Sequence, residues 1–157
     1  MTLVVEPELR AETLVPFRFA PGVQESLGRF QGRCTVVRLA TVDNDVLGVP
    51  RWYTLGEAWA EPGSPAAARW AGNPVVSVGE EDDPQLVLAT STPVVVVGVD
   101  NAASRWTRRV VDAVRATCRS VLVVDMGSRP DPSYADLATF GHDRAHGAAL
   151  LALLTAS

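Results

Sequence analysis

The carboxylates of Asp100 and Asp125 and the imidazole of His142 are the groups of this sequence best suited to proton transfer. Each follows a short apolar run of the kind that forms a buried strand. Ligands of open α/β sheets bind beyond the carboxyl ends of the strands, so we expect the three loops to line one crevice. These three residues are the candidate catalytic groups. The candidate ligand-binding residues are Asp100, Asn101, Arg105, Asp125, Met126, Gly127, Gly141 and His142.

Each candidate acid also has a structural interpretation. Asp100 or Asn101 can accept hydrogen bonds from a hydroxylated ligand, or can cap the helix that follows. The N-terminus of that helix can bind an anion. Asp125 can act as an acid or base if it is desolvated, or can accept a structural hydrogen bond from a neighbouring loop. The glycines in these loops suggest close approaches of the backbone.

The sequence gives little support for a metal or a cofactor. His142 and His146 stand four residues apart and would share a helix face, but no third ligand accompanies them. Asp143 beside them is equally suited to the first turn of a helix. The glycine-rich motifs of dinucleotide and phosphate binding and the serine nucleophile elbow are missing from the sequence. We therefore expect no cofactor.

Short β-branched runs predict the strands that carry these loops. Three of the runs are continuously apolar, which is typical of a parallel sheet covered by helices on both faces. The predicted strands are Leu3 to Val5, Thr35 to Leu39, Val75 to Val78, Val94 to Val97 and Val121 to Val124, with a further short run from Leu137 to Phe140. Helices are expected between them.

The best predicted helix spans residues 103–118, with an apolar stripe of Trp106, Val110, Val114 and Thr117. Another is expected over 143–154, and weaker ones over 22–30, 66–70 and 83–89. This alternation predicts a three-layer α/β/α sandwich with a mostly parallel, doubly wound sheet of five to six strands, forming one domain over 1–157.

Composition narrows the class of protein. The chain has 157 residues, too few for an eightfold β/α barrel of about 250 residues. Its formal charge of −4 argues against nucleic acid as a partner. It contains no apolar run of about 18 residues and no signal peptide, so we expect a cytoplasmic protein that does not enter a membrane. Cys34 and Cys118 are expected to be reduced and buried.

Three parts of the sequence carry a resemblance to a known family: residues 94–101 followed by Trp106, residues 121–127, and residues 134–141 with 147–151. Together they resemble the C-terminal α/β domain of glycoside hydrolase family 3, in particular its β-N-acetylhexosaminidase-like branch. The start of the chain, residues 3–6 and 16–17, is also similar to the segment that enters that domain. The likeness extends over nearly the whole chain. One departure is Ala102-Ala103-Ser104, where this branch often carries a histidine before the tryptophan.

The resemblance implies that a catalytic part is missing from these residues. In family 3 the nucleophilic aspartate and a sugar-binding Lys-His-Phe-Pro-Gly-His-Gly-like motif belong to a preceding barrel domain, and this sequence contains neither. Retaining hydrolysis needs two carboxylates about 5 Å apart. The resemblance therefore implies a domain that does not hydrolyse glycosides alone.

Two classes of function remain open. The first is an accessory domain that binds a sugar or another small hydroxylated ligand and docks onto a barrel protein or a second copy of itself. The second is a small isomerase, cyclase or dehydratase that uses Asp100, Asp125 and His142 for acid–base chemistry. A subunit of a split glycosidase, or a fragment of a longer hydrolase, is a further alternative.

Overall fold

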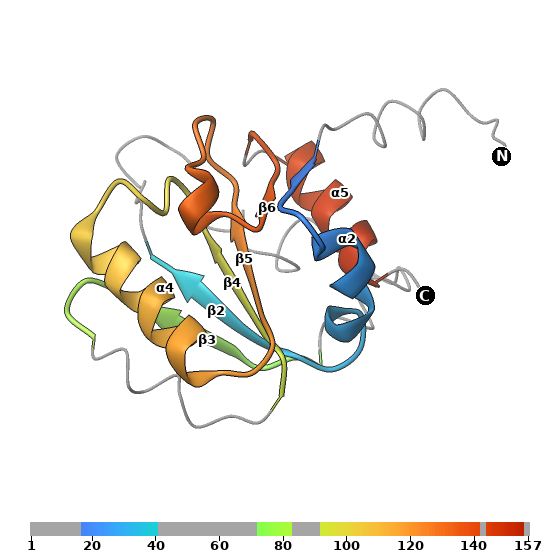
Figure 1. Ribbon diagram of the computed structural model, residues 1–157, viewed down its shortest axis with the longest axis horizontal. Helices are drawn as coiled ribbons and strands as arrows, with labels where there is room; N and C mark the ends of the chain where they lie inside the picture. Colours follow the sequence, from blue (N-terminus) through green and yellow to red (C-terminus); the bar gives the residue numbers. More distant parts are fainter. Residues whose placement is uncertain (1–16, 41–71, 83–91, 142–143, 156–157) are drawn as a thin grey trace, which may run out of the picture.

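The computed structural model describes residues 17–40, 72–82, 92–141 and 144–155, which form a six-stranded sheet (Figure 1). The strand order is β1-β6-β5-β4-β2-β3. All neighbouring strands run parallel except β1 and β6, which are antiparallel. The strands are β1 (Arg18–Phe19), β2 (Thr35–Leu39), β3 (Val75–Val78), β4 (Val94–Gly98), β5 (Val121–Asp125) and β6 (Leu137–Ala138). The predicted α/β fold with a mostly parallel sheet is confirmed.

Helices lie against both faces of this sheet. In Figure 1, α4 lies on one side of the strands, whereas α2 and α5 lie on the other. The helical segments are α2 (Val23–Ser26), the 3-10 helix η1 (Leu27–Phe30), α4 (Arg105–Thr117), the 3-10 helix η4 (Pro132–Tyr134) and α5 (Arg144–Thr155). None of the helices in the described ranges is long and apolar enough to cross a membrane.

The central strand β4 shows why both faces are covered. Successive side chains of a strand point to opposite faces. Val94 and Val96 belong to the apolar cluster that includes the buried valines of α4. Val95 and Val97 belong to the cluster that includes the leucines of η1 and α5. All four valines are fully buried, and each contributes about 1.5–3 kcal/mol of hydrophobic free energy.

The structure alters the expected boundaries of α4. The helix begins at Arg105, and its N-cap residue is Ser104, so neither Asp100 nor Asn101 caps it. The turn that precedes it, with the Ala103 amide donating to the Asp100 carbonyl, separates these residues from the helix. The buried face consists of Thr107, Val110, Val111 and Val114.

The expected apolar stripe of α4 is correct only in part. Val110 and Val114 are buried, and Trp106 is half-buried against the same cluster. Thr117 was wrongly placed on the stripe: it is exposed at the last position of the helix, and the next residue, Cys118, packs against the cluster instead.

The remaining predicted strands and helices agree with the structure in some places and not in others. The short strand β1 was not predicted, because two residues are too few to show a period. The weak helix over 22–30 is present as α2 and η1. The predicted segments 3–5, 66–70 and 83–89 lie outside the described residues.

Both cysteines are free thiols, as predicted. Cys34 is buried among the residues of the first cluster. Cys118 is only half-buried, contrary to expectation, because it follows the last turn of α4 at the edge of the second cluster.

Candidate functional site

Asp125 is the last residue of β5, and its carboxylate is completely buried. Oδ1 accepts hydrogen bonds from the amides of Asp100 and Gly127, both at 2.8 Å. Oδ2 accepts one from the amide of Asn101 at 3.0 Å. The parallel pairing of Gly98 with Asp125 brings this carboxylate beside the loop that follows β4. Through these hydrogen bonds, Asp125 holds the β4–α4 loop against the end of β5.

The surroundings of Asp125 act on its pKa in opposite directions. Burial raises the pKa above its ordinary value, and the nearby Asp100 carboxylate raises it further. The three backbone amides lower it, but burial is the larger effect. A raised pKa often accompanies catalysis. Here both oxygens are already occupied by backbone donors, which favours the structural interpretation of this residue.

Asn101 is also buried and also has a structural role. Its amide nitrogen donates to the carbonyls of Val124 and Tyr134, each at 3.1 Å. These two acceptors fix the orientation of the amide, because the flipped group would place its oxygen against two carbonyl oxygens. Its oxygen Oδ1 has no hydrogen-bond partner in the structure. Asn101 thus joins the β4–α4 loop to β5 and η4.

Two glycines allow these loops to approach one another. A methyl group on Gly98 would collide with the amide oxygen of Asn101. A methyl group on Gly127 would collide with the carboxylate of Asp100. The glycines predicted at close backbone approaches are therefore found at such places, and the carboxylate of Asp100 lies directly against Gly127.

An open crevice of about 350 Å³ lies beyond the carboxyl ends of β4 and β5. Asp100 adopts a left-handed backbone conformation, with φ of 56°, and its side chain is exposed. The loop after β5 supplies the opposite wall, which carries exposed charged side chains. The lining residues are Asp100, Ala102, Ala103, Ser128, Arg129 and Asp131.

The structure separates the predicted site residues into groups. Asp100 lines the crevice, whereas Asp125, Asn101 and Gly127 lie beneath it as part of the framework. Met126 is fully buried in the first apolar cluster and is not among the residues that line the crevice.

Of the remaining predicted residues, Arg105 and Gly141 do not line the crevice with Asp100. Arg105 is exposed at the first position of α4 and is not among the residues that line the crevice. Gly141 packs closely against the imidazole of His146. His142 lies outside the described residues. No group of three or more potential metal ligands occurs in the part of the chain that the structure describes.

The sequence predicted a loop at residues 125–129, but the exposed polar residues of this region were not chosen as site residues. Ser128 and Arg129 stood within the predicted loop, and Asp131 lay just beyond it. Asp131 caps η4, because its Oδ1 accepts the amide of Ser133 at 2.9 Å and Pro132 follows at the first helical position. The Asp-Pro pair was a sequence signal for this turn.

No model of a known protein family matches the sequence, and no curated protein or solved structure is significantly similar to it. The described residues form an α/β domain with an open, charged crevice at the strand ends. The chemistry of its ligand must be inferred from the crevice itself.

Proposed function

We propose that this chain is an accessory domain that binds a small hydroxylated ligand, such as a sugar, in the crevice beyond β4 and β5. The observation that supports this most directly is the exposed carboxylate of Asp100 facing a loop that carries Arg129 and Asp131 across an open space of about 350 Å³. We interpret the fold as a three-layer, doubly wound sandwich of the kind found at the C-terminus of family 3 glycoside hydrolases.

The mixture of donors and acceptors fits a polyol. The carboxylates of Asp100 and Asp131 accept hydrogen bonds from hydroxyl groups, Arg129 donates them and Ser128 does both. Two acidic groups against one basic group disfavour a strongly anionic ligand. The volume is near the lower end of the range of about 300–1,000 Å³ for small-molecule sites, which suits a single sugar ring.

The same geometry disfavours an acid–base enzyme. That alternative needs Asp100, Asp125 and His142 to reach one ligand atom. Asp125 does not line the crevice, and its oxygens are occupied by three backbone amides. We therefore propose a binding function without glycoside hydrolysis by this chain alone. A barrel-domain protein or a second copy of the chain is the proposed partner, and the cytoplasm the proposed location.

Titration of the full chain with N-acetylglucosamine, followed through backbone amide chemical shifts, tests the proposed site. We expect shifts at residues 100–103 and 128–131. Asp100→Asn should weaken binding roughly tenfold or more, because it removes a charged hydrogen-bond acceptor. The variant retains a residue that tolerates positive φ, so its fold should be preserved. Arg129→Ala should have a similar effect on binding.

Glu25→Gln, on the exposed surface of α2, is the matched control and should leave binding unchanged. If N-acetylglucosamine and glucose both cause no shifts at about 10 mM, the proposed ligand class is wrong. If the purified chain releases the aryl group from an aryl glycoside, and Asp100→Asn abolishes that release, then the proposed lack of hydrolysis is wrong.

A further inference from the structure

The strand β3 lies at one end of the sheet order and pairs only with β2 among the described strands. Its residues Val75 to Val78 include no proline and no charged residue. Val75 is 44% exposed, and Ser77 is exposed as well. Natural sheets commonly protect an edge with charges or proline within the strand. This edge lacks both.

The free backbone groups of β3 can be identified from its pairing. The carbonyls of Pro74 and Val78 accept hydrogen bonds from the amides of Val36 and Ala40, each at 2.9 Å. Successive residues of a strand direct their backbone groups to alternate sides. The amides and carbonyls of Val75 and Ser77 therefore point away from β2, towards the outer edge.

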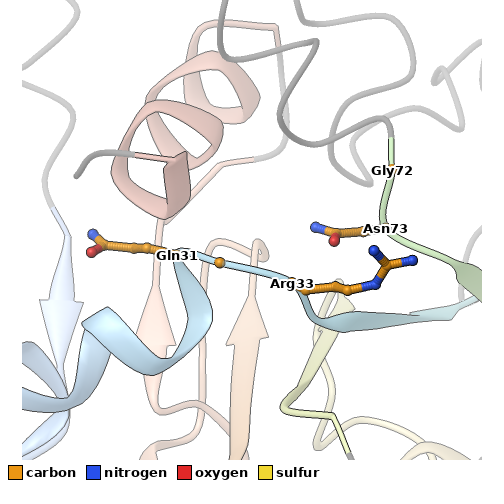
Figure 2. A pocket seen from close by; sticks show the side chains of 5 residues that line it. Gln31, Arg33, Gly72 and Asn73 are labelled. Atoms are coloured by element: carbon orange, nitrogen blue, oxygen red, sulfur yellow. The ribbon is translucent and has the colours of Figure 1, made fainter.

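The two ends of this edge carry opposite charges. The turn after β3 contains the exposed Glu80, Glu81 and Asp82, and it is held by a hydrogen bond from the Gly79 amide to Asp82 Oδ2 at 2.7 Å. At the start of β3, the exposed Arg33 lines a cavity of about 260 Å³ together with Gly72 and Asn73. Figure 2 shows its guanidinium beside the chain at Gly72 and Asn73, with Gln31 pointing away.

We propose that a second copy of this chain pairs with β3 in an antiparallel manner, about a two-fold axis at Val76. In this register Val75 of each copy exchanges amide-to-carbonyl hydrogen bonds with Ser77 of the other. Gly79 stays outside the pairing, because its amide donates to Asp82 Oδ2 and its carbonyl accepts the amide of Asp82. The acidic turn of one copy then lies near Gly72 of the other, beside Arg33. A parallel pair would instead place the two acidic turns together.

This inference specifies how a second copy, one of the two partners of the proposed function, would dock, but it does not depend on ligand binding, because the crevice lies beyond β4 and β5 and not along β3. The pairing joins the two sheets into one continuous sheet with closed two-fold symmetry. A short strand buries little surface, so the dimer should be weak and should form in a concentration-dependent way.

Sedimentation equilibrium of the full chain tests the dimer. From about 10 μM to 1 mM, the average mass should rise from 16.7 kDa towards twice that value. Ser77→Pro removes one of the two outward amides of each copy while leaving the β2–β3 hydrogen bonds in place, and it should weaken dimerisation at least about tenfold. Val75→Lys adds a charge to the edge and should act similarly. Ser77→Thr is the matched control and should preserve the dimer.

A charge exchange tests the register. Arg33→Glu and Glu81→Arg should each weaken self-association roughly tenfold, because each places like charges opposite one another twice per dimer. Mixing the two variants should restore association, since each mixed pair regains both attractive contacts. Circular dichroism tests whether each variant is folded. If Ser77→Pro does not fold, the effect of Val75→Lys on dimerisation tests the proposed edge. A monomer at every concentration, or a dimer that withstands both edge substitutions, would overturn the proposal.

Discussion

At the scale of single residues, burial gives two aspartates opposite roles. Asp125 is fully enclosed and its carboxylate holds three backbone amides in place. Asp100 belongs to the loop that Asp125 fastens, and its own carboxylate is exposed in the crevice. The first residue therefore positions the second. This division predicts that stability and binding will respond separately to substitution.

Asp125→Asn should reduce the free energy of unfolding by about 3 kcal/mol, because the new amide nitrogen opposes backbone donors that the carboxylate satisfied. Asp100→Asn should change that free energy by less than about 0.5 kcal/mol, because the residue is exposed and asparagine tolerates positive φ. Urea unfolding of both variants measures the difference. Equal losses of stability would contradict the structural role assigned to Asp125.

At the scale of elements, Asp136 connects β5 with α4. Its Oδ2 accepts the Val123 amide at 2.9 Å, and its own amide donates to the Val123 carbonyl at 2.7 Å. Its Oδ1 forms a salt bridge with Arg115 of α4 at 3.0 Å. Arg115 also donates to the Ser133 carbonyl at 2.6 Å. One carboxylate thus serves both a strand amide and a surface ion pair.

Asp136→Ala should therefore destabilise the protein more than Arg115→Ala. The first substitution leaves the strand amide of Val123 without its acceptor and should cost about 2 kcal/mol. The second removes a partly exposed ion pair and should cost no more than about 1 kcal/mol. Thermal unfolding of the two variants, compared at one pH and salt concentration, tests the order. The reverse order would show that the ion pair dominates the attachment of α4.

At the scale of the whole molecule, the sheet separates two apolar clusters, and the two cysteines lie by different clusters. Cys34 is buried in the cluster that contains the leucines of α5, and Cys118 lies at the margin of the cluster that contains α4. Burial raises the pKa of the Cys34 thiol from 9.0 to about 11. Burial also raises the pKa of Cys118. The folded state therefore holds the Cys34 proton more tightly than the unfolded chain does.

The raised pKa of Cys34 predicts that the stability of the protein depends on pH. Below pH 9.0 the thiol is protonated in both states and its contribution is fully present. Between pH 9.0 and about 11 the unfolded chain ionises first, so stability falls as the pH rises. The loss should be about 2 kcal/mol relative to Cys34→Ala, which does not titrate at this position. Denaturant unfolding of both proteins across this range measures it. A constant difference between them would contradict the raised pKa.

The sequence predicted those features of the structure that depend on a local pattern of residues. The valine-rich runs at 75–78, 94–97 and 121–124 predicted strands. The positions of Asp100 and Asp125 after two of these runs predicted a crevice at the carboxyl ends of the strands. The two-residue strand β1 gave no periodic signal. Arg129 and Asp131 were not chosen, because exposed polar residues in a loop look alike until the opposite wall of a cavity is known.

What the sequence alone determined is the class of fold, since uninterrupted β-branched runs are stable only where both faces of a strand are buried. It did not determine the lateral order of the strands, which places β4 between β2 and β5 and leaves β3 outermost. Nor did it distinguish the buried Asp125 from the exposed Asp100. Both depend on contacts between residues distant in the chain, and periodicity carries no information about such partners.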